Sequence, residues 1–311
     1  MQGTVAVTDY GWYAFLRSRQ LPEVNFWTPS DRRAFRAPAF SPFFFKLKKP
    51  HYAICGFGYF ARWASLPDWL AWDCFREGNG CASLPEMRAR IGAIRTRIGY
   101  VPAGPLSNIG CILLVQPTFF PPSAWVPQPD DWRGRTVSNK AYDLTSGEGR
   151  RMWEACIERA VQPSAALAAG PAEVGERVQR YGVPRMVAPR LGQGTFRVAV
   201  TDAYRRACAV TGEHSLPVLE AAHLWSYAAG GPHDVRNGVL LRADLHRLLD
   251  QGYVTVMPDY KLEVSQRLYE DYGNGRSYRP LHGVKIQAPT KENERPATEF
   301  VTWHNEHVYL G

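Results

Sequence analysis

Residues 208–256 read CAVTGEHSLPVLEAAHLWSYAAGGPHDVRNGVLLRADLHRLLDQGYVTV. Within this stretch two histidines and one asparagine follow the spacing H-x13-N-x8-H, at His223, Asn237 and His246. A short apolar run leads to His223, glycine- and proline-rich turn residues follow it, and a second apolar run follows Asn237. This order predicts two strands joined by a turn.

The residues after the second apolar run predict a helix. It begins at about Ala243 and closes at Asp250-Gln251-Gly252, and another strand follows at 253–256. The strand–turn–strand–helix unit brings His223, at the end of a strand, and His246, on the helix, together from opposite arms.

This pattern resembles the HNH endonucleases, the ββα-metal nucleases, over roughly residues 190–265. The resemblance implies that His223 is the general base, that His246 holds a divalent cation, and that Asn237 braces the loop that carries the base. A neutral imidazole is suited to accept a proton from water. The expected cofactor is Mg²⁺ or Mn²⁺, although one imidazole ligand also admits nickel, cobalt or zinc.

The stretch departs from the family pattern in two ways. Many HNH nucleases carry an Asp or His before the base as a second metal ligand, and here that residue is Ala222. Glu220 or Asp244 could supply the missing oxygen, or substrate phosphate and water could complete the shell. Many relatives also bind zinc through two Cys-x-x-Cys pairs, of which only Cys208 remains. We expect no structural zinc and a fold that depends on its own core.

The composition bounds the class of protein. The 311 residues are 45% hydrophobic, which is enough for two cores of ordinary size. No apolar stretch approaches transmembrane length, and the first residues lack the pattern of a signal peptide. Six scattered cysteines favour a reducing compartment, so we expect a cytoplasmic protein.

The charge is uneven along the chain. The net charge is +8, but residues 1–135 hold 16 basic and 9 acidic residues whereas residues 136–311 hold 21 and 20. A basic front half is compatible with a DNA partner, because cationic side chains bind phosphates. An ordinary solvated surface is the alternative.

Residues 1–135 predict strands with helices between them. We expect a strand at 4–10, a helix at 12–20, a loop at 23–38, two strands within 41–63 joined at Lys49-Pro50, helices within 66–80 and 83–97, and a strand within 108–120.

This pattern resembles PUA-like barrels, with EVE and ASCH domains as the nearest relatives. The resemblance implies a barrel mouth that holds an extruded modified base between aromatic rings. The candidates for this pocket are Asp9, Tyr10, Trp12 and Trp27, and burial in the core is the competing interpretation for each aromatic ring.

Residues 136–189 predict a helical connector and an alanine- and glycine-rich linker, and residues 190–311 a nuclease domain with a C-terminal extension. A helix is expected from Gln193 to Arg206. The arginines available for the DNA backbone are Arg197, Arg205, Arg206 and Arg242, with packing or solvation as the alternative. His214 and His233 are expected to be solvated in turns, and His304 and His307 to pack and cap.

These observations predict an α+β chain with an N-terminal PUA-like β-barrel with flanking helices, a linker and a C-terminal ββα-metal domain. The predicted function is that of a modification-dependent, type IV-like restriction endonuclease that cuts double-stranded DNA and reads modified cytosine through residues 1–135. The alternatives are an HNH nuclease that reads ordinary sequence or a backbone modification, and a DNA-binding protein without catalysis, which Ala222 keeps open. A homodimer is expected, because cutting both strands with a single-metal site needs two sites or two visits.

Overall fold

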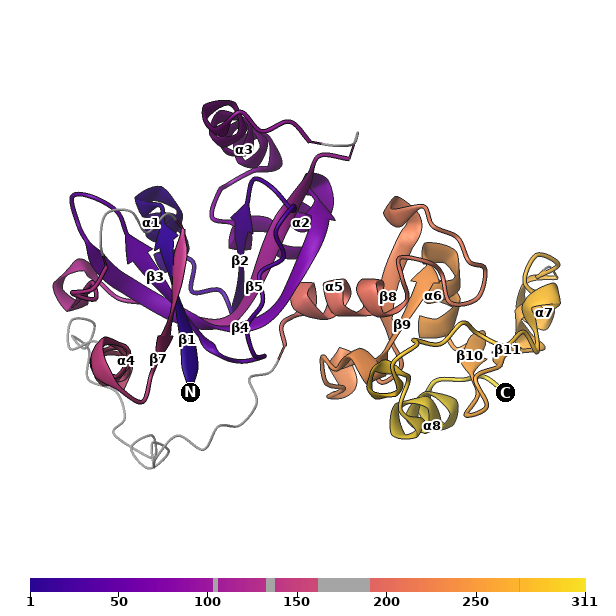
Figure 1. The fold of residues 1–311 in the computed structure, drawn as a ribbon. Helices are drawn as coiled ribbons and strands as arrows, with labels where there is room; N and C mark the ends of the chain where they lie inside the picture. Colours follow the sequence, from indigo (N-terminus) through magenta and orange to yellow (C-terminus); the bar gives the residue numbers. More distant parts are fainter. Residues whose placement is uncertain (103–105, 133–137, 162–190, 274) are drawn as a thin grey trace, which may run out of the picture. The chain divides into compact units, whose positions relative to one another are not determined.

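The computed structural model describes residues 1–102, 106–132, 138–161, 191–273 and 275–311 (Figure 1). The chain divides into two compact units, Met1–Pro189 and Arg190–Gly311. Both units mix helices and strands, so the fold class is α+β. Within the described ranges, no helix has both the length and the apolar character needed to cross a membrane.

The N-terminal unit is built on one mixed sheet. Its elements are β1 (Gln2–Thr8), α1 (Tyr10–Arg17), β2 (Glu23–Thr28), β3 (Pro42–Leu47), β4 (Ala53–Pro67), α2 (Asp68–Phe75), η1 (Arg76–Asn79), α3 (Leu84–Ile98), β5 (Asn108–Phe119), η2 (Pro122–Ala124), β6 (Val126–Pro127), β7 (Asn139–Asp143) and α4 (Gly147–Val161). The strand order is β2-β5-β4-β3-β1-β7, with β6 paired to β4. Only the β1–β3 pair is parallel among these pairings.

The run of three phenylalanines in β3 shows why this sheet is covered on both faces. Successive side chains of a strand point to opposite faces. Phe43 and Phe45 lie in the cluster that contains Trp12 of α1, whereas Phe44 lies in the cluster that contains Met152 of α4. The whole of β3 is therefore buried, and its sequence shows no alternation of apolar and polar residues.

The structure differs from the predicted N-terminal half in its boundary. Residues 139–161, which we expected in the connector, belong to the N-terminal unit, because β7 pairs antiparallel with β1 and α4 packs on the sheet. This pairing joins residues far apart in the sequence, and no local pattern encodes it. The alanine- and glycine-rich linker lies outside the described residues.

Two further details of the prediction change. Residues 23–28, expected in a loop, form β2 and pair with β5, where Val24 is buried in the core. The long β4 pairs with β3, β5 and β6 (Figure 1). In the described part of the chain the outer strands β2 and β7 do not pair with each other. The sheet is open there, and closure into a barrel remains a prediction.

The C-terminal unit contains two small antiparallel sheets, β8–β9 and β10–β11. Its elements are α5 (Gln193–Ala203), η3 (Leu216–Val218), β8 (Leu219–His223), η4 (Tyr227–Ala229), η5 (Val235–Asn237), β9 (Gly238–Arg242), α6 (Ala243–Asp250), β10 (Val254–Val256), β11 (Leu262–Val264), α7 (Arg267–Tyr272), η6 (Arg279–Leu281), η7 (Glu292–Glu294) and α8 (Thr298–His307). The predicted order strand, turn, strand, helix, strand over 219–256 is therefore confirmed.

Packing of helices on β8 and β9 sets the position of the histidines. Leu245 and Leu249 of α6, four residues apart on one helical face, are fully buried in the same core as Val239 to Leu241 of β9. Helix α5 also contacts both strands, and Gly238 lets it approach: a Cβ at that position would lie 2.3 Å from Cγ2 of Val200.

Helix α5 is shorter than predicted. It ends at Ala203, and Arg205 and Arg206 adopt left-handed backbone angles, with φ of 54° and 60°. The chain reverses there so that Cys208 to Val210 enter the core and the amide of Ala209 bonds the carbonyl of Leu240. A tertiary contact thus overrides the helical pattern of the sequence.

Candidate active site

His223 is the last residue of β8 and lies opposite Gly238 of β9. The ring of Phe196, from α5, stacks on the imidazole with centroids 3.9 Å apart and planes 14° apart. Burial lowers the pKa of His223 to about 4, with smaller contributions from the charges of His233 and His246. His223 is therefore neutral at pH 7 and able to accept a proton.

Asn237 is fully buried and holds the loop that follows His223. Its Oδ1 accepts from the amide of Trp225 at 2.8 Å, and its Nδ2 donates to the carbonyls of Trp225 and Pro232, each at 2.9 Å. The backbone of the same residue accepts from the amide of Leu224. One side chain thus ties both ends of the turn between β8 and β9.

His246 lies on α6 between two carboxylates. Nδ1 is 2.7 Å from Oε2 of Glu220, and Nε2 is 3.4 Å from Oδ2 of Asp250, one helical turn further along. Glu220 comes from β8, the strand that ends at His223, and α6 packs on that strand. His223 and His246 therefore lie on adjoining elements, and the charge of His246 contributes to the lowered pKa of His223.

The residues around His246 offer few protein ligands for a divalent cation. A carboxylate on Nδ1 orients the imidazole and directs the Nε2 lone pair outward, the usual arrangement for a metal-binding histidine. Asp250 would then supply an oxygen beside Nε2, and both side chains are partly open to solvent. In the described part of the chain, no group of three or more His, Cys, Asp or Glu residues is assembled for a metal. Water and substrate phosphate would have to complete the shell.

Asp244, which we considered as a second metal ligand, pairs with Arg242. Its two oxygens bond Nε and Nη2 of Arg242 at 2.9 and 2.6 Å, and Tyr278 donates to Oδ2 at 3.2 Å. The contact with Arg242 lowers the pKa of Asp244. The pair uses two of the five N–H groups of Arg242, so the arginine keeps donors for a phosphate contact.

His233 is a site residue that the sequence analysis missed. Expected in solvent, it is half-buried, and its Nδ1 lies 3.1 Å from Nε2 of His223. Its ring stacks on Tyr227 with centroids 4.3 Å apart. The turn that returns to β9 brings His233 back over the strand end, and no spacing rule signals that contact.

Three other histidines lie as the sequence predicted. His214 is exposed. His304 is buried and bonds Thr255 and the carbonyl of Leu249, and His307 bonds the carbonyl of Trp303. The packing and capping predicted for the last two is confirmed.

The arginines proposed for the DNA backbone differ in their present contacts. Arg205 donates to Oγ1 of Thr290, and Arg206 lies 4.0 Å from a carboxylate oxygen of Asp202. Arg197 is half-buried on α5.

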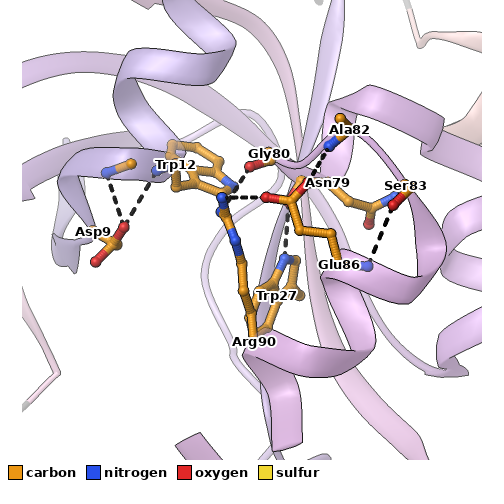
Figure 2. A network of polar contacts seen from close by, with 10 residues as sticks. Asp9, Trp12, Trp27, Asn79, Gly80, Ala82, Ser83, Glu86 and Arg90 are labelled. Carbon is orange, nitrogen blue, oxygen red and sulfur yellow. Dashed lines mark hydrogen bonds and ion pairs between the residues drawn. The ribbon is translucent and has the colours of Figure 1, made fainter. Parts of the chain in front are cut away.

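The four candidates for a base-reading pocket have different contacts in the structure. Asp9 caps α1 by accepting from the amides of Gly11 and Trp12 (Figure 2). Trp12 itself is buried among phenylalanines of the core. Trp27 donates from Nε1 to the carbonyl of Asn79, as Figure 2 shows. Tyr10 is exposed and stacks on His51 with centroids 5.0 Å apart.

Trp12 has a further structural contact on the loop after η1. A Cβ at Gly80 would lie 2.0 Å from Cδ1 of Trp12, so only glycine fits there. Arg90 holds this loop by donating to the carbonyl of Gly80 and to Oε1 of Glu86 (Figure 2). Packing therefore accounts for Trp12.

Comparison with known proteins gives one family match and several distant structural likenesses, among them an ASCH protein and a restriction endonuclease. The family "HNH endonuclease" matches residues 208–257. No curated protein matches the chain. The crystal structure of ASCH from Zymomonas mobilis is 15% identical with a TM-score of 0.32, covering 49% of this chain and 94% of that one. A structure described as the modification dependent TagI restriction endonuclease is 11% identical with a TM-score of 0.29, covering 98% of this chain and 81% of that one.

The two structural likenesses are too distant to define a function. The family match covers the end of β8, the buried Asn237 and helix α6. Residues 208–257, which include His223, Asn237 and His246, are similar to the HNH endonuclease family.

Proposed function

We propose that the chain is a metal-dependent HNH endonuclease in which His223 is the general base. The observation that carries this proposal is the pairing of a neutral, half-buried imidazole at a strand end with a second imidazole, His246, held between two carboxylates on the adjoining helix. Hydrolysis of a phosphodiester needs these two kinds of group, one to take a proton from water and one to hold a cation.

Each residue of the segment has a distinct task in this proposal. His223 accepts a proton from the attacking water, the new P–O bond forms, and the bond to the leaving oxygen breaks, with solvent supplying its proton. Asn237 keeps the loop after His223 in place. Glu220 orients His246, which would hold the cation together with Asp250 in place of the ligand that Ala222 lacks. The bound cation would supply electrophilic assistance at the phosphate.

The substrate we propose is double-stranded DNA with a modified base, read by the N-terminal unit. The basic excess of residues 1–135 supports a phosphate-binding surface, and the order of elements supports the comparison with PUA-like readers. Of the pocket candidates, Tyr10 has an exposed ring, whereas Trp12 would have to leave the core to stack on a base. Methylated or hydroxymethylated cytosine is the proposed mark.

A protein that binds DNA without cutting it is the second candidate. Ala222 is fully buried and supplies no ligand, and no group of three or more His, Cys, Asp or Glu residues in the described part of the chain is arranged to hold a metal.

Parallel digestion of methylated, hydroxymethylated, glucosylated and plain DNA with Mg²⁺ or Mn²⁺ separates these possibilities. We expect cutting of modified DNA, loss of cutting in His223→Ala, and no loss in His214→Ala, whose histidine is exposed. Equal cutting of plain DNA would refute the reader. Binding without cutting under any divalent ion would favour the second candidate.

A further inference from the structure

Two imidazoles meet at the end of β8. Nε2 of His223 and Nδ1 of His233 are 3.1 Å apart, a hydrogen-bond distance. Phe196 stacks on His223, and Tyr227 stacks on His233 with planes only 6° apart. The two stacks restrict both ring planes, so the contact between the nitrogens is set by packing from α5 and η4.

The backbone on both sides of His233 is anchored. The carbonyl of Pro232 accepts from Nδ2 of Asn237, and the side chain of Asp234 caps η5 by accepting from the amide of Arg236. Gly231 approaches the chain so closely that a Cβ there would lie 1.9 Å from the carbonyl oxygen of Trp225. His233 is therefore held in a fixed turn.

The chemistry of a neutral imidazole limits how this pair can be protonated. Each ring has one N–H and one lone pair. If Nδ1–H of His233 donates, the lone pair on Nε2 of His223 accepts that hydrogen bond and Nδ1 of His223 carries the proton. His223 then has no free lone pair to accept a proton from water. If His223 donates from Nε2, its Nδ1 keeps a lone pair, and no hydrogen bond from the described residues reaches that atom.

We propose that His233 is a positioning residue that accepts a hydrogen bond from Nε2–H of His223 and so keeps Nδ1 of His223 unprotonated for the attacking water. The proposal rests on the proposed function of His223 as the base. The fixed turn and the two ring stacks then serve to hold one tautomer of the base, as a partner on the far nitrogen does for other functional histidines.

Two substitutions of His233 in the full chain separate this role from a structural one. His233→Phe keeps a ring for Tyr227 but removes the acceptor, whereas His233→Asn places an amide oxygen near the position of Nδ1. We expect His233→Phe to lower kcat about 10- to 100-fold with little change in KM, and His233→Asn to recover most of that loss. His214→Phe and His214→Asn are the matched controls, because His214 is exposed.

A direct readout of the tautomer does not depend on cleavage. Nitrogen-15 NMR of the His223 ring should show Nε2–H in the parent chain and in His233→Asn, and a mixture of both forms in His233→Phe. Thermal unfolding of each variant detects loss of fold. If His233→Phe does not fold, the NMR spectra of the parent chain and of His233→Asn still show which tautomer His223 adopts.

Two results would overturn the proposal: an Nδ1–H tautomer of His223 in the parent chain, or a His233→Phe variant that folds, cuts like the parent and leaves the tautomer unchanged. A parent chain that cuts no DNA with Mg²⁺ or Mn²⁺ would instead refute the proposed nuclease function, while the NMR result would still decide the role of His233.

Discussion

Replacing Asn237 with alanine removes three hydrogen bonds from the interior of the C-terminal unit. The amide of Asn237 accepts from Trp225 and donates to Trp225 and Pro232, and the residue is fully buried. Three backbone groups would lose the partner that the buried side chain of Asn237 supplies. At about 1 kcal/mol for each net hydrogen bond, we expect this unit to lose about 3 kcal/mol of unfolding free energy.

Hydrogen exchange gives a measurement specific to this loop. The amide of Trp225 donates to Asn237, so its protection should fall in Asn237→Ala to the extent of the lost stability. Asn139→Ala, at an exposed position of β7, is the control and should change the unfolding free energy by less than about 0.5 kcal/mol. An Asn237→Ala chain with parental protection at Trp225 would refute the bracing role.

Asn237→Asp tests the direction of the same hydrogen bonds. A carboxylate can accept from Trp225 but cannot donate to the two carbonyls, so it should destabilise the unit at neutral pH. Burial raises the pKa of such a carboxyl, and protonation restores one donor. The deficit relative to the parent should therefore shrink as the pH falls, and a deficit that grows would contradict this assignment.

Three further perturbations have expected outcomes. His246→Ala should abolish Mn²⁺ binding measured by calorimetry as well as metal-dependent cleavage; unchanged binding would place the cation elsewhere. Lys46 is 3% exposed, bonds the carbonyl of Leu47 and lies over the ring of Trp132, and burial lowers its pKa. Because the unfolded chain binds this proton more tightly, the free energy of unfolding should rise with pH up to the ordinary lysine pKa. Chemical denaturation at several pH values should show that this rise is lost in Lys46→Met. An equal pH dependence of the unfolding free energy in both proteins would count against the buried charge of Lys46. Gly238→Ala should destabilise the C-terminal unit by about 1–3 kcal/mol in thermal unfolding, because the added Cβ meets Val200, and a neutral effect would show that α5 can shift.

Local patterns predicted the elements that carry the candidate site. The apolar runs on either side of Gly230 and Pro232 predicted β8 and β9. The residues that follow β9, up to Asp250-Gln251-Gly252, predicted α6 and its end. Periodicity and turn chemistry act over a few residues, so they can be read without knowing the rest of the fold. The HNH match covers this locally readable part of the chain.

The partners of the site histidines depend on packing between segments and could not be predicted in the same way. Glu220 reaches His246 because α6 packs on β8, and Asp244, equally acidic and nearer in sequence, pairs with Arg242. His233 reaches His223 only because the turn folds back over the strand end. The amino-acid composition does not distinguish the acids and histidines that meet in the site from those that do not.

The sequence by itself was sufficient for the spacing of His223, Asn237 and His246 and for the order of the elements that present them, because both depend on interactions between near neighbours. It was not sufficient for the pairing of β7 with β1, the early end of α5 or the contact between two imidazoles. Those features depend on which surfaces meet when distant segments pack, and that is determined by the free energy of the whole core.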